Sequence, residues 1–517
     1  MGIPGLTMME NAGRGMAERI REGILGGHCR DMKIAIVCGR GNNGGDGFVV
    51  ARYLAEAGAK VAIHLLGSLA SLSGDAKANA VRPQALGLTI AETDGQSQPP
   101  DFASFDLLID AIFGTGFRGP VDGVAARYID AMNRSRIRIV AVDSPSGLNG
   151  DSGVISDHAI RAHTTMTLAA SKRGQWLWPG RACAGHLETI DIGIPDAAVA
   201  AEAVNLGLIT EEYIRSALPR RPADAHKGTF GTCLLIGSSV GMSGAVALAA
   251  NAAMRSGVGL AYVGVPASLA DVVDAQATEP VIFPLPEVRT RRVLALRALG
   301  EIVKLCDSAD AVALGPGLST HHETQELARR LVSRRSKPMV LDADGLNACA
   351  RDIAVLEEPS EVPLVITPHV GEMARLLGRD KSAIAADREA AAREASRRFH
   401  CITVMKGAPT FVADPTGMVY LNPTGNSGMA SGGVGDVLTG IIVSFLAQGC
   451  SPLVAALLGV YVHGQAGDLA AAELGERSLV ASDLIDCLPN VFMLVERQAS
   501  CHREQPSPQP SLRGRGG

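Results

Sequence analysis

Short apolar segments bounded by glycine alternate with helical patterns along most of the chain. In its first part these segments are KIAIVCG, KVAIHLLG, FDLLIDAIFG and RIRIVAVDSPSG, and an Ala-rich helical pattern follows the first of them. This order of strands and helices is typical of a doubly wound, mainly parallel sheet, whose ligands bind at the carboxyl ends of the strands. We therefore predict an α/β domain over residues 1–217.

The alternation starts again after Leu218–Gly231, a stretch with Pro, Arg and Gly that is typical of a connection between domains. The next apolar segments are TCLLIGSS, VGLAYVGVP, ADAVALGPGL, PMVLDADGLN, PLVITPHVGE and CITVMKGAPTFVAD. A second domain is predicted over residues 218–495, so the fold class is α/β with two doubly wound domains. The last segment, 496–517, is rich in Pro, Arg, Ser and Gln and is predicted to be disordered.

The composition limits the kinds of molecule that the protein is expected to bind. The 517 residues carry 48 basic and 53 acidic side chains, a net charge of −5 that offers no basic excess for nucleic acid. No stretch reaches the roughly 18 uninterrupted apolar residues of a membrane span, and the ten cysteines show no disulfide or zinc spacing. We expect a soluble, cytoplasmic protein that acts on small molecules, binds neither nucleic acid nor membrane, and forms a symmetric homo-oligomer.

Three loops are predicted to meet at one edge of the first sheet. GRGNNGGDG follows the first strand, where glycines let the backbone turn tightly and approach a ligand, and the next helix offers its amides to an anion. Asp110 ends the strand before GTGFRGP, and Asp143 and Ser146 lie in VDSPSGLNG after another strand. A strand-to-helix turn without a ligand is the alternative for the first loop.

These loops contain several side chains whose oxygen atoms could bind a cation. Asn43, Asp110, Asp143 and Ser146 could coordinate a monovalent or divalent cation, because hard cations select oxygen. Each aspartate taken alone could instead cap a turn or the following helix. Lys172 follows a further apolar segment and is a candidate proton donor, although an ordinary surface lysine is the commoner fate of this residue type.

The segments MMENAG, GNNGGDGFVVAR, DAIFGTGFRG, VDSPSGL and SKRG, in this order, resemble the NAD(P)H-hydrate epimerase family. The resemblance implies a Rossmann-like first domain that interconverts the R and S hydrates of NADH and NADPH with a bound potassium ion (K⁺). It implies that the hydrate is bound by Asn42, Asn43, Gly44, Gly45, Asp46, Gly114, Thr115, Gly116, Phe117, Arg118, Gly119, Pro120 and Asp143. It implies that potassium is held by Asn43, Asp110 and Ser146. Epimerisation moves protons in both directions, and Asp110 and Lys172 are the expected carriers.

Residues 426–440, NSGMASGGVGDVLTG, place one carboxylate, Asp436, between glycines and an apolar segment. Glycine amides before a helix N-terminus form a concavity suited to a transferring phosphoryl group, and Asp436 would take the proton of the attacking hydroxyl. The helix dipole is expected to keep this carboxylate ionised, and a helix cap behind a loop is the alternative. Lys406 and Thr410 are expected to meet nucleotide phosphates, and Glu372 to lie near magnesium.

The segments HKGTFG, GMSGAVALAA, GPGL, LDADGLN, TPHVGE, MKGAPT and MASGGVGDVLTG resemble the ADP- or ATP-dependent NAD(P)H-hydrate dehydratase family, a branch of the ribokinase-like fold. The resemblance implies that Asp436 activates the C6 hydroxyl of the S hydrate for phosphorylation by ADP or ATP with Mg²⁺, and that elimination then restores NAD(P)H. It implies a nucleotide site formed by Lys406, Gly407, Ala408, Pro409, Thr410 and Gly435. It implies a hydrate site formed by Ala245, Gly317, His369 and Asp436. Asp342 and Asp344 are given no catalytic role, since either could cap a helix.

Taken together, the two resemblances predict a bifunctional repair enzyme, because the dehydratase uses one epimer and the epimerase supplies it from the other. The alternative is a small-molecule kinase of the ribokinase-like fold, whose first domain is a non-catalytic nucleotide-binding module. A kinase would release a phosphorylated product instead of NAD(P)H, and a non-catalytic module would leave the epimers unchanged.

Overall fold

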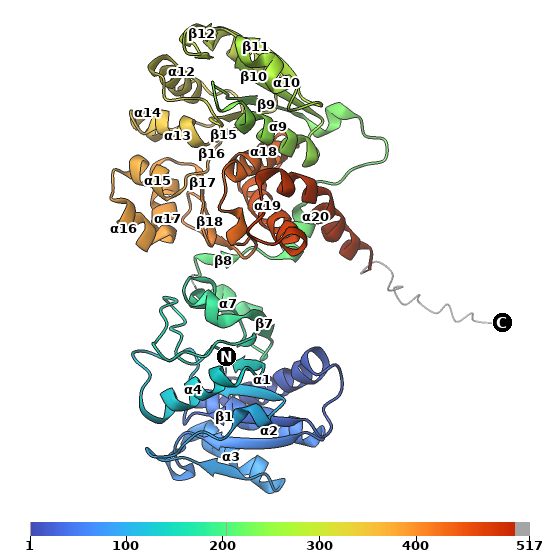
Figure 1. The fold of residues 1–517 in the computed structure, drawn as a ribbon, viewed down its shortest axis with the longest axis vertical. Helices are drawn as coiled ribbons and strands as arrows, with labels where there is room; N and C mark the ends of the chain where they lie inside the picture. Colours follow the sequence, from blue (N-terminus) through green and yellow to red (C-terminus); the bar gives the residue numbers. More distant parts are fainter. Residues whose placement is uncertain (1, 203, 502–517) are drawn as a thin grey trace, which may run out of the picture. The chain divides into compact units, whose positions relative to one another are not determined.

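The computed structural model describes residues 2–202 and 204–501, in two compact units that divide between residues 204 and 205 (Figure 1). The sequence placed this boundary after residue 217. The structure assigns residues 205–217 to the second unit, because β8 (Leu206–Leu208) pairs with β19 (Val419–Asn422) of the second sheet. Helix α8 (Glu211–Ala217) then packs on two helices of the same unit.

The first unit contains a seven-stranded parallel sheet in the order β3-β2-β1-β4-β5-β6-β7. The order reverses between β1 and β4, as in a Rossmann fold, and a ligand is expected where the loops after these two strands part. The strands are β1 (Lys33–Cys38), β2 (Lys60–Leu65), β3 (Ile90–Glu92), β4 (Leu107–Ala111), β5 (Ile139–Val142), β6 (Thr164–Leu168) and β7 (His186–Ile190).

Helices cover both faces of this sheet, because successive side chains of a strand point to opposite faces. Ile34 and Ile36 of β1 pack in one apolar cluster with α1 and α2, whereas Ala35 and Val37 pack in the other with α4. The helices are α1 (Gly5–Arg19), α2 (Asn42–Glu56), α3 (Gly74–Ala85), α4 (Gly123–Ser135), α5 (Arg173–Trp176), α6 (Arg181–Ala184) and α7 (Asp196–Ala201).

The second unit contains a ten-stranded sheet in the order β11-β10-β9-β14-β15-β16-β17-β18-β19-β8. Its pairs are parallel except β17 with β18 and β18 with β19. The order reverses between β9 and β14. The remaining strands are β9 (Thr232–Ile236), β10 (Leu260–Pro266), β11 (Val281–Leu285), β14 (Ala311–Leu314), β15 (Met339–Leu341), β16 (Leu364–Ile366), β17 (Ile402–Met405) and β18 (Thr410–Ala413), with a separate hairpin of β12 (Glu287–Val288) and β13 (Val293–Leu294).

Four helices form the main core of this unit with the sheet: α9 (Ser243–Arg255), α18 (Val434–Ala447), α19 (Pro452–Leu474) and α20 (Ala481–Cys501). Helix α18 lies close against α9, since a Cβ on Gly440 would lie 2.0 Å from the Ala249 carbonyl oxygen. The other helices are α10 (Ala270–Asp274), α11 (Leu299–Asp307), α12 (His322–Ser333), α13 (Ala343–Cys349), α14 (Ala354–Glu357), α15 (Val370–Leu377), α16 (Lys381–Ala386) and α17 (Arg388–Arg398). The predicted fold class is thus confirmed for both domains.

Helices α19 and α20 concern two predictions, the absence of a membrane span and the disordered tail. Among the described residues, α19 is long and apolar enough to cross a membrane by length and composition, but 72% of its apolar window is buried, as in a core helix. Helix α20 extends to Cys501, so residues 496–501 are helical where disorder was predicted. Residues 502–517 of the predicted tail lie outside the described part of the chain.

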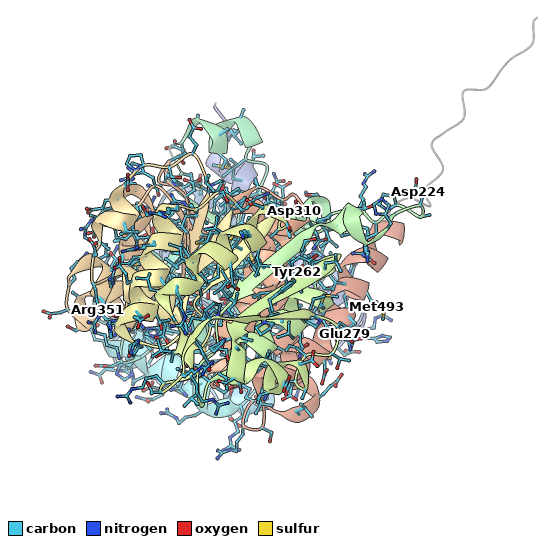
Figure 2. The ribbon with its side chains drawn as sticks, turned by 90° about the horizontal axis from the view of Figure 1, so that it is seen from above. Asp224, Tyr262, Glu279, Asp310, Arg351 and Met493 are labelled. Carbon is cyan, nitrogen blue, oxygen red and sulfur yellow. The ribbon has the colours of Figure 1, made fainter. Side chains whose placement is uncertain are left out.

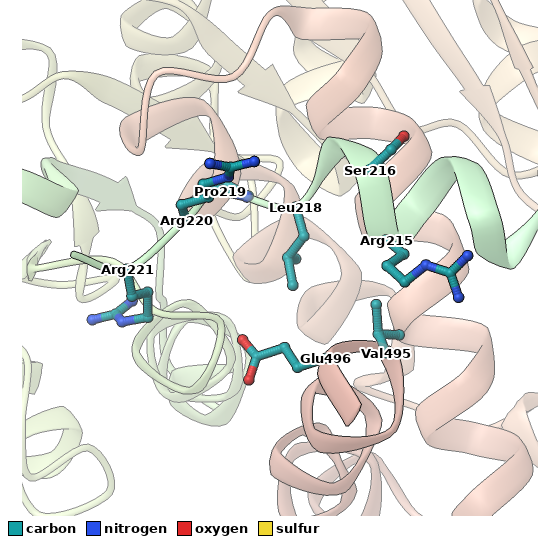
Figure 3. A pocket seen from close by; sticks show the side chains of 8 residues that line it. All are labelled: Arg215, Ser216, Leu218, Pro219, Arg220, Arg221, Val495 and Glu496. Carbon is teal, nitrogen blue, oxygen red and sulfur yellow. The ribbon is translucent and has the colours of Figure 1, made fainter. Parts of the chain in front are cut away.

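Asp224, Glu279 and Arg351 are exposed polar residues on the surface of the second unit (Figure 2). Tyr262 of β10 packs edge-on against Phe283 of β11. A hollow of about 330 Å³ lies beside α8 and α20 (Figure 3). It is lined by Arg215, Ser216, Leu218, Pro219, Arg220, Arg221, Val495 and Glu496. This hollow contains none of the predicted site residues.

Candidate active sites

The GNNGGDG segment of the first unit forms the start of α2 rather than a loop. A Cβ on Gly44 would lie 1.9 Å from the Gly39 carbonyl oxygen, and one on Gly47 would lie 2.6 Å from the Ala111 Cβ. Two of the glycines therefore let the helix start directly on the ends of β1 and β4. The predicted hydrate-binding run Asn42–Asp46 lies at this helix start, beside the point where the strand order reverses.

Asn43 meets the loops that follow β4 and β5. The point where a Gly114 Cβ would lie is 3.1 Å from Asn43 Oδ1 and 3.3 Å from Asp143 Oδ2. Asn43 is 8% exposed, and its amide oxygen and nitrogen have no hydrogen-bond partner among the described residues. A buried amide without partners is costly, so this side chain is suited to a ligand.

Asp110 is fully buried and joins two loops. Its Oδ1 accepts hydrogen bonds from Ser146 Oγ (2.6 Å) and the Ile112 amide (3.2 Å), and its Oδ2 accepts one from the Ser146 amide (2.8 Å). Burial raises the pKa of Asp110 to about 6, against the opposing effect of these bonds. The carboxyl thus positions Ser146, and it does not contact Lys172, which was expected to share the proton transfer with it.

Lys172 instead pairs with Asp143. Its Nζ lies 2.5 Å from Asp143 Oδ1 and also donates to Thr167 Oγ1 (3.0 Å) and the Leu168 carbonyl oxygen (2.8 Å). The Lys172 and Asp143 side chains are 20% and 10% exposed, so this lysine is not an ordinary surface lysine. The structure therefore supplies an ammonium–carboxylate pair at the carboxyl ends of β5 and β6.

The predicted loop Gly114–Pro120 lies mostly at the surface beyond this pair. Phe117 stacks on Phe113 with ring centres 5.2 Å apart. Arg118 donates to the Thr115 and Phe117 carbonyl oxygens and forms an ion pair with Asp151. The described residues contain no group of three or more His, Cys, Asp or Glu side chains arranged to hold a metal ion.

In the second unit Asp436 lies in the first turn of α18, whose N-cap Gly433 has φ +88°. That left-handed conformation explains the glycine. A Cβ on the next glycine of the turn, Gly435, would lie 3.4 Å from Lys406 Nζ, so the ammonium lies over the start of the helix. The predicted nucleotide-binding residues Lys406 and Gly435 are thus neighbours.

Lys406 is held by a carboxylate to which the sequence analysis gave no role. Its Nζ lies 2.7 Å from Asp342 Oδ1 and 3.9 Å from Glu372 Oε2. Asp342 Oδ2 accepts a hydrogen bond of 2.8 Å from Thr439 Oγ1 on α18. Burial alone would raise the pKa of Asp342, but the Lys406 ammonium and these hydrogen bonds outweigh it and keep that pKa below its usual value.

Asp436 differs from the sequence-based expectation. Burial, followed by the Asp342 charge, raises its pKa to about 7, and the Lys406 ammonium opposes this shift only in part. Neighbouring carboxylates and desolvation therefore outweigh the helix dipole, which was expected to keep Asp436 fully ionised. A carboxyl with a pKa near neutrality is suited to accept a proton in one step and release it in another.

The other predicted residues of this unit lie at the same sheet edge. A Cβ on Gly317 would lie 3.2 Å from the Ala245 Cβ, so these two meet where the strand order reverses between β9 and β14. His369 Nδ1 accepts from the Gly371 and Glu372 amides as the N-cap of α15. Its Nδ1 is thus occupied, and its Nε2 lies 3.4 Å from Glu372 Oε1.

Two positioning residues were missed by the sequence analysis. Arg388 donates to the Ala408 (2.5 Å) and Pro409 (2.7 Å) carbonyl oxygens and so fixes the predicted nucleotide loop. His463 Nε2 lies 2.9 Å from the Val434 carbonyl oxygen at the start of α18, and burial lowers its pKa to about 4. An arginine on a helix and a histidine in an apolar helix carry no local signal for these contacts.

A carboxylate of raised pKa at a glycine-led helix, next to a lysine–aspartate pair, is typical of an enzyme that transfers a phosphoryl group. Two family models match the chain: NAD(P)H-hydrate dehydratase matches residues 233–490, and the YjeF-related protein N-terminus matches residues 5–174.

Relatives match almost the whole chain. A protein of Moorella thermoacetica named bifunctional NAD(P)H-hydrate repair enzyme Nnr is 44% identical over 500 residues, which cover 96% of this chain and 94% of that protein. A protein of the same name from Escherichia coli K12 is 34% identical, with coverage of 88% and 84%. The Bacillus subtilis ADP/ATP-dependent NAD(P)H-hydrate dehydratase co-crystallised with ATP/Mg²⁺ is 34% identical, covers 57% of this chain and 100% of its own, and has a TM-score of 0.49.

The chain therefore belongs to the family of bifunctional NAD(P)H-hydrate repair enzymes. The family predicted from the sequence motifs is confirmed for both domains.

Proposed function

We propose that this chain restores hydrated NADH and NADPH in two steps. The first unit interconverts the R and S hydrates, and the second unit phosphorylates and dehydrates the S form with ADP or ATP. The observation that carries the proposal is the Asp436–Lys406–Asp342 cluster at the start of α18, in a chain that matches two-domain repair enzymes over nearly its full length.

The dehydratase step follows from this cluster. The C6 hydroxyl oxygen of the S hydrate attacks the terminal phosphorus of the nucleotide, its proton passes to Asp436, and the bond to the leaving nucleotide phosphate breaks. Lys406 and the amides at the start of α18 stabilise the charge on the phosphoryl oxygens. The new phosphate then leaves with the C6–O electron pair while C5 loses a proton, which restores the double bond of NAD(P)H.

The remaining predicted residues of the second unit position the two substrates. The segment 406–410, fixed by Arg388, would bind the adenine nucleotide with Gly435. Ala245, Gly317 and His369 Nε2 would contact the hydrate. Comparing the rates with ADP and with ATP determines which nucleotide the enzyme prefers.

Magnesium would enter this site with the nucleotide. Mg²⁺ keeps several waters and needs only one or two carboxylates beside phosphates. The clustered carboxylates of Asp342, Glu372 and Asp436, which raise the pKa of Asp436, suit an added positive charge. Glu372 would hold the ion, which supplies charge neutralisation to the phosphates when bound.

Potassium fits the first unit. The unpartnered Oδ1 of Asn43 is an oxygen donor, and Asp110 Oδ2, which accepts one hydrogen bond, keeps a free lone pair. With Ser146 Oγ these atoms form the predicted ligand set, and the ion would neutralise charge beside the hydrate when bound. Asp143, which is paired with Lys172, would move protons in place of Asp110.

The test is the recovery of NADH absorbance when the purified protein acts on mixed hydrate epimers with magnesium, potassium and ADP or ATP. We expect full recovery by the wild type and none by Asp436→Asn, with Asp224→Asn, an exposed aspartate of the same unit, as the matched control. A phosphorylated product without NADH would refute the proposal in favour of a kinase. Recovery that stops at the S fraction would refute the epimerase activity.

The predicted homo-oligomer and the cytoplasmic location stay predictions, as does the predicted absence of nucleic-acid and membrane partners.

A further inference from the structure

Asp46 is a buried carboxyl near the start of α2 that has no polar partner in the described part of the chain. It is 7% exposed and lies three residues after Asn43, so both side chains share one face of α2. No hydrogen bond or ion pair joins it to another described residue. A structural carboxylate at this depth would be paired, because burying an unpaired charge is costly.

The surroundings of Asp46 are those of the epimerase site. The charged groups that affect the pKa of Asp46 are Asp143 and Lys172, which form the pair at the ends of β5 and β6. Asn43 on the same helix face meets Gly114 and Asp143. Asp46 therefore lies on the helix face that carries Asn43, among the residues that were assigned to the hydrate.

We propose that Asp46 is the acid that donates a proton during epimerisation, and that Asp143 of the Asp143–Lys172 pair is the base. This inference rests on the proposed function of the first unit and replaces Asp110 as the second proton carrier. Asp110 is ill suited to that role, because both of its oxygens already accept hydrogen bonds from Ser146.

The surroundings of the two carboxyls agree with these roles. Burial, and then the Asp143 charge, raise the pKa of Asp46 well above its usual value, which favours its protonated form. Asp143 is paired with the Lys172 ammonium at 2.5 Å, whereas Asp46 has no hydrogen-bond or ion-pair partner among the described residues. The proposed base is thus a paired carboxylate and the proposed acid is an unpaired carboxyl, a division of roles that acid–base catalysis uses.

The proton balance closes for ring opening at C6, the carbon that bears both the hydroxyl and ring nitrogen N1. Asp143 takes the hydroxyl proton, the oxygen electron pair forms a carbonyl, and the C6–N1 bond breaks with its electron pair on N1, which takes the Asp46 proton. The carbonyl rotates about the C5–C6 bond. N1 then attacks its other face, returns its proton to Asp46, and the oxygen regains its proton from Asp143, so nothing is consumed.

The test uses the full chain and pure R hydrate, with the two epimers separated by chromatography and NADH followed in parallel. Asp46→Asn should lower kcat for R-to-S conversion at least about 100-fold, as loss of a general acid does. The same variant should dehydrate S hydrate at the wild-type rate. Asp157→Asn, an exposed aspartate of the same unit, is the matched control and should convert both epimers normally.

Several outcomes would overturn the assignment. A kcat within about threefold of the wild type would show that Asp46 is not the acid, and a rise in KM alone would reduce it to a binding residue. If Asp46→Asn does not fold, Asp46→Ser replaces it under the same criteria. If the wild type interconverts no epimers while it dehydrates the S form, the proposed function of the first unit fails, and the role of Asp46 fails with it.

Discussion

Lys406→Met removes the ammonium that lies 2.7 Å from Asp342 and leaves a carboxylate that is 2% exposed. Asp342 keeps its hydrogen bond from Thr439 but loses the charge that offsets its burial. Removing one partner of a buried ion pair costs about 3–5 kcal/mol. Because Lys406 is 20% exposed and Asp342 can take up a proton, we expect about 3 kcal/mol at neutral pH, at the lower end of that range.

The two units can be followed separately, because the two tryptophans of the chain, Trp176 and Trp178, both lie in the first unit. Tryptophan fluorescence therefore reports the unfolding of the first unit, and far-UV circular dichroism reports both. For a unit of this size 1 kcal/mol corresponds to about 2–4 °C in Tm. Lys406→Met should lower the second unit's transition by about 6–12 °C and leave the fluorescence transition unchanged.

Asp342→Asn is the matched control. It leaves Thr439 a hydrogen-bond acceptor and frees a lysine that can reach water, so the expected loss is smaller, about 1–2 kcal/mol. The double variant should lose less than the sum of the single losses, because it contains no unpaired buried charge. Strict additivity, or a Tm for Lys406→Met within about 1 °C of the wild type, would refute the buried-pair argument.

Four further tests concern other parts of the second unit. Because Asp436 must be ionised to accept a proton and its pKa is raised to about 7, the dehydration rate should rise with pH through about 7, and a rate that is flat from pH 6 to 8 would contradict its role as the base. The same raised pKa makes the unit less stable as pH rises through about 7, so Asp436→Asn should raise Tm at pH 8 and not at pH 4. Arg388→Ala frees the loop at Ala408 and should weaken ADP binding in calorimetry about tenfold, with little change in kcat. Gly440→Ala places a methyl group 2.0 Å from a backbone oxygen of α9, so we expect an unfolded second unit by circular dichroism beside a normal fluorescence transition.

The sequence was sufficient to predict which polar residues lie at the strand ends. An apolar segment followed by Asp110, Asp143 or Lys406 is a local pattern, and parallel strands in a doubly wound sheet bring such ends to one edge. Asp436 has a different local pattern, since it lies between glycines and an apolar segment. The strand order of both sheets agrees with that expectation. The residues predicted for each unit therefore lie near one another, although the sequence patterns that predicted them are local.

The pairings between these ends could not be predicted. Asp342 looked like a helix cap, yet its partners are Lys406, 64 residues away, and Thr439, 97 residues away. Lys172 pairs with Asp143, 29 residues away, rather than with Asp110. The domain boundary was misplaced for the same reason, since β8 joins the second sheet through β19, more than 200 residues later.

The two units use the same physical arrangement for different reactions. In each, a carboxyl near the start of a glycine-led helix has a pKa raised by burial and by a second aspartate, and lowered in part by a lysine that pairs with that aspartate. The pairs are Asp143–Lys172 at 2.5 Å and Asp342–Lys406 at 2.7 Å. Because the lysine offsets the charge of one carboxylate, the other can stay buried and exchange a proton. Removing either lysine should therefore raise the pKa of the neighbouring free carboxyl, Asp46 or Asp436, and suppress the reaction of that unit alone.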